Sequence, residues 1–299
     1  MTTTSSIVLP LLGAIDPWRW QAHPEVWFLV LAILACGWWA VRVIGPRVVP
    51  AGQPVATTFQ RRAFVAATVL LLASADWPVH DIAEAHLYSV HMVQHMAITF
   101  IVPPLYLLAT PAWLVRLLLL EGGAGSRLVR RMAHPVVAGV VFNALVAITH
   151  WSGVVQLSFD SGTFHFSLHL VLFLSALLMW VPVAAPLPEL RISLPGQMIY
   201  LFLMSIIPTI PAAWLTFAEG VVYGHYDDGF QMWGVSVQSD QQVAGLIMKL
   251  LGGFYLWGII ILKFIGYSRI HRRDGQVMRP ADGRHLDLQR RISEAELVE

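Results

Sequence analysis

Long apolar runs, separated by short segments rich in Gly, Pro and charged residues, dominate the pattern of this chain. Two of them, residues 26–44 and 246–264, come close to the ~20 apolar residues that a helix needs to cross the hydrocarbon core of a bilayer. The pattern predicts an all-α fold, a polytopic membrane helix bundle of seven transmembrane helices. We expect these helices at residues 26–44, 62–77, 86–110, 135–151, 164–183, 197–217 and 241–265.

The same pattern divides the chain into three parts. Residues 1–25 are predicted to form an N-terminal segment, residues 26–265 the transmembrane domain, and residues 266–299 a polar tail. A short helix is expected near the end of the tail, at residues 287–299. The N-terminal segment has no basic leading region and no small-residue cleavage site, so we do not expect a removable signal peptide.

Composition supports a membrane protein and excludes several other classes. Hydrophobic residues make up 57% of the chain and charged residues only 12%, far from the values of a soluble domain. A net charge of +1 gives no reason to expect nucleic-acid binding. The single cysteine, Cys36, rules out an intramolecular disulfide and is expected to pack within the first helix. Proline pairs predict kinks in the third and sixth spans, at Pro103–Pro104 and at Pro208 and Pro211.

Basic residues predict the orientation of the bundle. The first, third and fifth loops and the tail carry arginines, whereas the second, fourth and sixth loops contain neither Lys nor Arg. Only Arg19 breaks this alternation. Because basic loops stay in the cytoplasm, the N-terminus is predicted outside and the C-terminus inside.

Five histidines and one carboxylate are predicted to meet near the outer face. His91 and His95 in the third span, and His165 and His169 in the fifth, each stand four residues apart and therefore share a helix face. His150 and Asp240 reach the same level from the fourth and seventh spans. Ionisable side chains inside spans are costly and usually mark function, so we predict that these residues bind a metal ion. A solvated position is expected for His80, His86, His134, His225, His271 and His285, with His86 the strongest exception.

Neighbouring residues bear on which metal is bound. Imidazole suits copper, zinc, iron and nickel, whereas thioethers favour Cu(I). Met92 and Met96 are expected to face lipid or core, and an inward position of either one would favour copper. Asp240 is either a ligand or an orienting partner of a histidine. Gln94, Gln241 and Gln242 are further orienting candidates, and Lys249 is expected to pair with a carboxylate or to line a wet cavity.

Several motifs together resemble the CtaG-type cytochrome c oxidase assembly factor family. They are HMVQHM followed by PPLYLLATP, HFSLHLVLFLSALLMWVP and SDQQVAGLIMK, and the similarity covers about residues 60–265. Members are seven-span bacterial plasma-membrane proteins that take part in making active haem–copper oxidase. The resemblance implies functional roles for His91, His95, His165, His169 and the Asp240–Gln241 step, and the sequence departs from the family pattern at Lys249.

The expected function is therefore copper binding near the extracytoplasmic face during assembly of a respiratory oxidase, with no reaction turned over by the protein itself. Its partner would be an oxidase subunit or another copper carrier. Two alternatives remain open. Three histidines, a carboxylate and a metal-bound water would also suit an intramembrane zinc hydrolase. Imidazoles from two helices would also suit a b-type haem protein.

Overall fold

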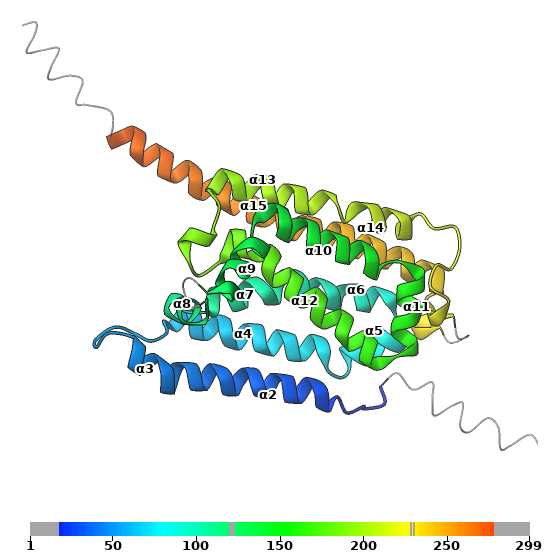
Figure 1. The fold of residues 1–299 in the computed structure, drawn as a ribbon. Coiled ribbons are helices and arrows are strands. Elements are labelled where there is room, and N and C mark those ends of the chain that lie inside the picture. The colour runs from blue at the N-terminus through cyan, green and yellow to red at the C-terminus, as the bar shows by residue number, and fades with distance from the viewer. Residues whose placement is uncertain (1–17, 120–122, 228, 230, 278–299) are drawn as a thin grey trace, which may run out of the picture.

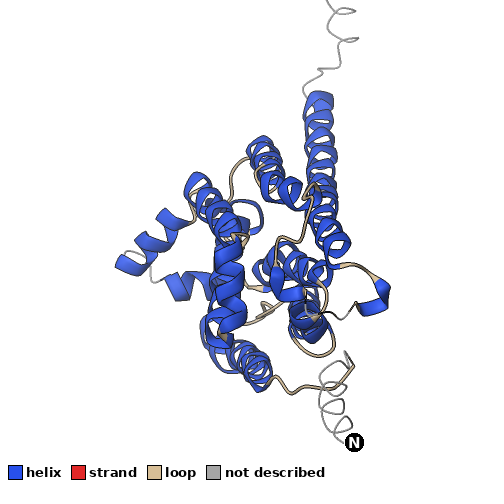
Figure 2. Cartoon of the chain, turned by 90° about the vertical axis from the view of Figure 1, so that its right-hand side faces the viewer, coloured by secondary structure: helices blue, strands red, loops and turns tan. Residues whose placement is uncertain are grey.

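The protein is a bundle of long helices, and the described residues contain no strand (Figures 1 and 2). The structure is a computed structural model that describes residues 18–119, 123–227, 229 and 231–277. The helix predicted at residues 287–299 lies outside this range. The all-α prediction is confirmed for the described residues.

The first half of the bundle is built from helices of very different length. In chain order they are α2 (Pro24–Trp39), the π-helical turn η1 (Ala40–Ile44), α3 (Gly45–Val48), α4 (Thr58–Ala75), α5 (Val79–Ala85), α6 (Tyr88–Met96), the π-helical turn η2 (Ala97–Ile101), α7 (Val102–Ala109), α8 (Ala112–Leu119) and α9 (Ala124–Met132).

The second half contains the longest helix. Its elements are α10 (Pro135–Thr149), α11 (Ser152–Asp160), α12 (Gly162–Ala184), η3 (Pro188–Leu190), α13 (Leu194–Ile206), α14 (Thr209–Thr216), η4 (Gly224–Tyr226), η5 (Met232–Gly234) and α15 (Val237–Val277). Figure 1 shows the C-terminal part of α15 projecting from the bundle. This helix continues without a break past residue 265, where the polar tail was predicted to begin.

Between five and seven of these segments can cross a membrane, so the chain is a multi-pass membrane protein. Five are long and apolar enough alone: Pro24–Val48, Tyr88–Ala109, Gly162–Ala184, Leu194–Thr216 and Val237–Arg272. Two bent pairs bring the number to seven, α4 with α5 at 40° and α9 with α10 at 70°. Each of the seven predicted spans overlaps one of these segments.

The proline pairs of the third and sixth spans have different effects on their helices. The sixth span breaks into α13 and α14 at Pro208, as predicted, because proline has no backbone N–H to donate to the preceding turn. In the third span, Pro103 and Pro104 sit in the first turn of α7, directly after the π-helical turn η2. The wide turn therefore accommodates the prolines while Tyr88–Ala109 continues as one helix.

The helix α2 lies at the edge of the bundle and packs against α4 (Figure 1). It buries a few residues such as Val26 and Val30, while Phe28 and Leu31 are exposed on its outer side. Cys36 is also exposed, so the prediction that it packs is wrong. The reason is that a peripheral membrane helix has only one neighbour and turns its remaining faces toward lipid.

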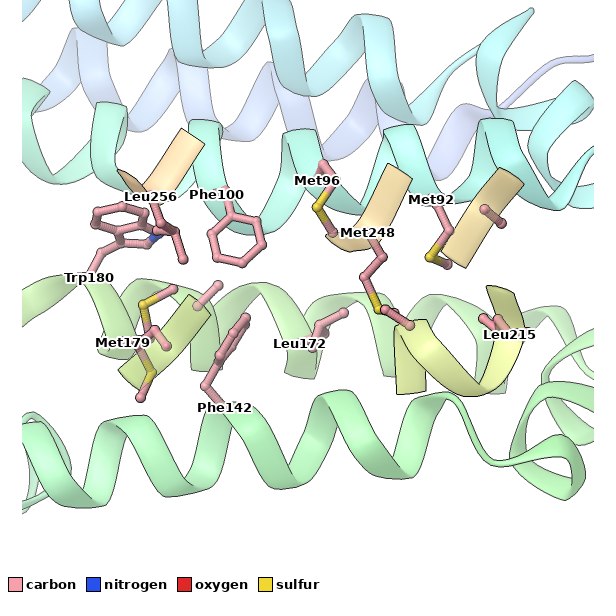
Figure 3. Close-up of a cluster of buried hydrophobic side chains, with 14 of the residues drawn as sticks. Met92, Met96, Phe100, Phe142, Leu172, Met179, Trp180, Leu215, Met248 and Leu256 are labelled. Carbon is pink, nitrogen blue, oxygen red and sulfur yellow. The ribbon is translucent and has the colours of Figure 1, made fainter. Parts of the chain in front are cut away.

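A large apolar core lies between α6, α10, α12, α13, α14 and α15. It is rich in methionine and aromatic side chains, including Met92, Met96, Phe100, Phe142 and Trp180 (Figure 3). Asp240 and the histidines of α6 and α12 lie at the end of the bundle where α5 and α11 are found. The apolar core therefore packs against one side of the group formed by Asp240 and these histidines.

Candidate metal centre

Three of the predicted histidines converge on one point between α6 and α12. One ring nitrogen from each of His91, His95 and His169 lies within 4.8 Å of the others. The ring centroids of His91 and His95 are 4.4 Å apart, and those of His95 and His169 are 4.9 Å apart. Tetrahedral coordination with metal–nitrogen bonds of ~2.0–2.1 Å places ligand nitrogens about 3.3 Å apart. Small side-chain movements would therefore let one ion contact all three imidazoles.

His165 and His150 extend this group on two sides. The ring of His165 stacks on that of His169 at 4.6 Å, and both of its buried nitrogens lack a hydrogen-bond partner. The ring of His150 lies 6.4 Å from that of His95. Its Nδ1 is 2.7 Å from the carbonyl of Val146, while its buried Nε2 has no hydrogen-bond partner. All five predicted histidines line one cavity, and two of them offer nitrogens that no protein atom satisfies.

Asp240 is placed differently from the histidines, because its carboxylate caps the first turn of α6. It accepts hydrogen bonds from the backbone N–H of Tyr88 at 2.6 Å and of Ser89 at 3.2 Å, and from the hydroxyl of Ser89. The N-cap residue of α6, Leu87, has no side chain that could do this. Because the first N–H groups of a helix lack partners within it, the carboxylate supplies one from another helix. His91 lies one turn further along the helix that Asp240 fixes.

The side chains of Gln241 and Gln242 form hydrogen bonds with the backbone of the loop after α14 instead of with a histidine. The side chain of Gln241 accepts from the backbone N–H of Val222 at 2.9 Å and donates to the carbonyl of Tyr223 at 2.9 Å. Burial raises the pKa of Tyr223 to about 12, so its hydroxyl stays protonated. That hydroxyl donates to the backbone carbonyl of His150 at 2.8 Å. The glutamine therefore acts on the site indirectly, through the loop and Tyr223.

The π-helical turn η2, which follows His91 and His95 along the chain, is hydrogen-bonded to α12. The indole N–H of Trp180 donates to the carbonyl of Thr99 at 3.0 Å, and both side chains are buried. Such a turn leaves carbonyls without their usual helical donors, and a donor from a neighbouring helix can satisfy one of them. The contact joins the two helices that carry His95 and His169.

Methionines line a second cavity that shares His95 and His150 with the first. Met92, Met96 and Met248 are all buried and lie side by side in Figure 3. The two methionines of α6 therefore face the core. Gly252 opposite leaves the sulfur of Met96 uncovered, since a Cβ at this position would lie 3.2 Å from it.

Lys249 is an exposed residue that lines this second cavity. Its ammonium donates to the hydroxyl of Thr209 at 2.6 Å. Among the described residues no carboxylate pairs with it, so of the two predicted arrangements the structure has the cavity-lining one.

The family model of the cytochrome c oxidase caa3 assembly factor (Caa3_CtaG) matches residues 35–269. The chain belongs to this family. No curated protein and no solved structure matches it. The matched residues include every histidine of both cavities, Asp240 and the three buried methionines. The earlier resemblance to oxidase assembly factors is therefore confirmed.

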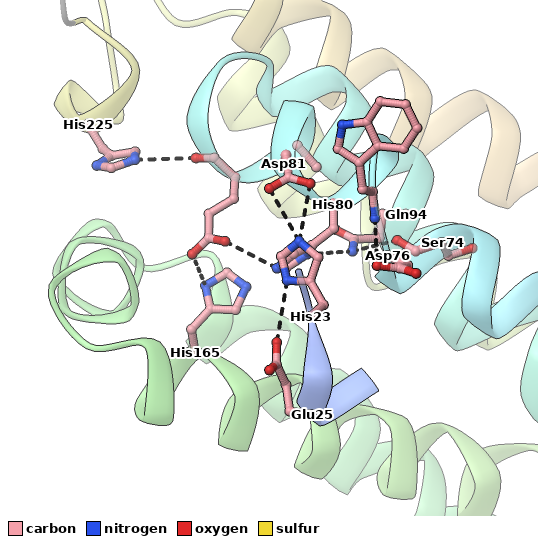
Figure 4. A network of polar contacts seen from close by, with 12 residues as sticks. His23, Glu25, Ser74, Asp76, His80, Asp81, Gln94, His165 and His225 are labelled. Atoms are coloured by element: carbon pink, nitrogen blue, oxygen red, sulfur yellow. Dashed lines mark hydrogen bonds and ion pairs between the residues drawn. The ribbon is translucent and has the colours of Figure 1, made fainter. Parts of the chain in front are cut away.

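The bundle also has polar residues near the histidine triad that the sequence did not reveal. His80 and Glu84 on α5 pair at 3.1 Å, and Glu84 approaches His165 at 3.9 Å (Figure 4). His23, which precedes the matched region, contacts Asp81 at 3.2 Å. The i,i+4 spacing of His80 and Glu84 was the available signal, and it is the same spacing that drew attention to the histidine pairs.

Two histidines predicted to be solvated are packed instead. The side chain of His80 is only 18% exposed, because Glu84 and the amide of Gln94 enclose it. His225 is half-buried and stacks on Phe159 with ring centroids 3.6 Å apart. The short helices α5 and α11 lie where the sequence predicted loops. Side chains of these helices enclose both rings. His86 is half-buried, His134 and His271 are exposed, and His285 lies outside the described residues.

Proposed function

We propose that this protein holds a copper ion with the imidazoles of His91, His95 and His169 and supplies it to a haem–copper oxidase during assembly. The observation that carries the proposal is the convergence of these three side chains, from two helices, inside a membrane-spanning bundle. Burying three imidazoles together is costly unless something binds them, since each ring leaves polar nitrogens in an apolar setting. Copper is the cargo here, and no reaction turned over by the protein is proposed.

The methionine cavity favours copper over zinc. Cu(I) binds thioether sulfur well, whereas zinc sites are built from imidazole, thiolate and carboxylate. Met92, Met96 and Met248 border the same histidines, His95 and His150, that line the first cavity. An ion leaving the imidazoles on this side would meet soft ligands.

The remaining predicted residues take supporting roles in this proposal. His150 and His165 have unsatisfied nitrogens next to the triad and are the candidates for a fourth ligand. Asp240 acts through the first turn of α6, because its carboxylate already accepts three hydrogen bonds there. It thereby fixes the helix that carries His91 and His95.

We further propose that the centre lies near the extracytoplasmic side of a bacterial plasma membrane. Arginines gather at the opposite end of the bundle, including Arg61 in the first turn of α4, Arg116 on α8 and Arg130 on α9 (Figure 1). Basic segments of this kind next to membrane spans stay in the cytoplasm. The partner is then an oxidase subunit or a copper carrier on the outer side. Reversible binding suits delivery, because neutral imidazoles release an ion when a partner offers competing ligands.

Metal analysis of gently purified protein tests the proposal. We expect about one Cu(I) per chain at the imidazoles, with zinc absent and no haem absorption band. His95→Ala and His169→Ala should each abolish binding without loss of the folded protein, since both rings face the cavity. His134→Ala is the control, because His134 is exposed at the start of α10. Bound zinc with a water ligand would favour the hydrolase, and a Soret band would favour the haem protein.

A further inference from the structure

A second group of imidazoles and carboxylates, drawn in Figure 4, adjoins the histidine triad through His165. Its central residue is Glu84 on α5. One carboxylate oxygen of Glu84 is 3.1 Å from Nε2 of His80, and the other is 3.9 Å from Nδ1 of His165. Glu84 therefore lies between His80 and His165, and the ring of His165 stacks on His169 of the triad.

Exposure falls from Glu84 to His165 within this group. Glu84 is 35% exposed and His80 18%, whereas His165 is 7% exposed. From His165 the next rings follow at short spacing, with His169 at 4.6 Å and His91 at 6.1 Å. The result is an unbroken row of metal-ligating groups from the water-accessible edge to the triad.

The orientation of His80 is fixed by hydrogen bonds. The side-chain amide of Gln94 donates to the carbonyl of Ser74 at 2.7 Å and to Nδ1 of His80 at 3.2 Å. Since Nδ1 accepts, the proton of the neutral ring is on Nε2, which faces Glu84. His80 therefore donates from Nε2 to Glu84, and a hydrogen-bonded carboxylate of this kind is typical of metal ligands.

His165 has the opposite character, because neither of its buried nitrogens has a hydrogen-bond partner. The 3.9 Å contact with Glu84 is an ion-pair distance and too long for a hydrogen bond. An unsatisfied imidazole is costly in a packed site unless a ligand occupies it part of the time. His165 is therefore the natural step between Glu84 and the triad.

We infer that Glu84 and His165, with His80 holding Glu84 in place, form a transient metal-binding position through which the ion enters and leaves the triad. This inference rests on the proposed function. The ion first contacts the Glu84 carboxylate, which His80 holds in place through its Nε2–H. It then passes to His165 and on to His169 and His91, so that each ligand is exchanged for the next without a fully uncoordinated intermediate.

Such a position changes the rates of loading and release but leaves the affinity of the triad unchanged. Glu84→Gln keeps the size of the side chain and removes its charge. We expect this variant to slow both association and dissociation by the same factor, about tenfold, comparable to the effect of removing one polar partner of a metal site. The dissociation constant and the one-to-one stoichiometry should stay as in the parent protein.

Stopped-flow absorption with Co²⁺ measures these quantities on the full-length protein in detergent. Co²⁺ is a suitable probe because it takes imidazole ligands, binds more weakly than Cu²⁺ and so dissociates at a measurable rate. Glu25→Gln is the matched control. Glu25 is 49% exposed at the same end of the bundle and contacts His23 at 3.4 Å, so this variant removes an equal charge from beside the row.

The outcomes separate the two proposals. Equal slowing of both rates in Glu84→Gln, with Glu25→Gln unchanged, supports the inference. Unchanged rates, a weaker affinity without slower release, or equal slowing by Glu25→Gln would overturn it, since these outcomes indicate no role, a ligand of the final site, or general electrostatic attraction. A parent protein that binds no Co²⁺ and no Cu(I) overturns the proposed function together with this inference.

Discussion

The carboxylate of Asp240 offers a sharp test of how the bundle positions its histidines. Replacing it with alanine removes the acceptor of two backbone N–H groups and one hydroxyl at the start of α6. Tyr88, which carries the first of these N–H groups, is only 2% exposed, so water cannot readily replace the carboxylate. We expect Asp240→Ala to destabilise the fold and to weaken metal binding together.

The magnitude follows from the contacts that are lost. A helix cap of this kind is worth ~0.5–2 kcal/mol, and an unsatisfied buried donor costs a further ~1–3 kcal/mol. The negative charge next to the helix N-terminus adds ~0.3–1 kcal/mol. Asp240→Ala should therefore cost about 2–6 kcal/mol of folding stability. Asp240→Asn keeps one acceptor oxygen and should lose about half as much. Metal affinity should fall by about 10- to 100-fold in Asp240→Ala, the range found when an orienting partner is removed.

Thermal unfolding in detergent and Co²⁺ titration check the two effects, with Asp227→Ala as control because Asp227 is an exposed loop carboxylate. Asp240→Ala should unfold several degrees lower than the parent, with Asp240→Asn between them. If Asp240 were itself a ligand, both variants would lose the ion and neither would unfold earlier. That pattern would refute the positioning role.

Three further predictions concern the metal, the orientation and the cellular role. Met92→Leu and Met248→Leu should weaken retention of Cu(I) but not of Co²⁺. Met179→Leu should weaken retention of neither ion, because this buried methionine does not line the cavity. Equal loss of both ions in the Met92 or Met248 variant would point to a packing defect. A reporter fused after residue 122 should face the cytoplasm and one fused after residue 160 the outside, and an outside signal at 122 would reverse the proposed orientation. Deletion of the gene should leave oxidase subunits synthesised but poorly active, with partial recovery at high copper by mass action, whereas normal oxidase activity at scarce copper would contradict the proposed role.

Helical spacing was enough to predict that the central histidines of the site come together. His91 and His95 share a face because they are four residues apart, and His169 reaches the same level from another span. These predictions needed only the periodicity of a straight helix and the depth of each residue in its span. The convergence of His91, His95 and His169 is confirmed by the structure, and the bound metal stays a prediction.

Contacts between distant segments could not be predicted in the same way. The level of Asp240 was predicted, but its contact with Tyr88 joins residues 152 positions apart and depends on the relative height of α6 and α15. Glu84 and His80 were missed because α5 has only seven residues and reads as a loop in a hydropathy pattern. The packing of Met92 was left between lipid and core, since a helix apolar on all sides gives no direction.

The π-helical turn η2 lets the two halves of one transmembrane helix be aimed independently. A turn of this kind holds one residue more than an α-helical turn, and each residue rotates a helix by about 100°. Here the half before the turn brings His91 and His95 to His169 of α12, while the half after it, α7, packs against both α4 and α12. Removing a single residue from Ala97–Ile101 would restore a regular helix and force one half to rotate against its neighbours. The length of this five-residue segment therefore determines the direction in which His91 and His95 point. A substitution within the segment keeps that direction, whereas an insertion or a deletion changes it.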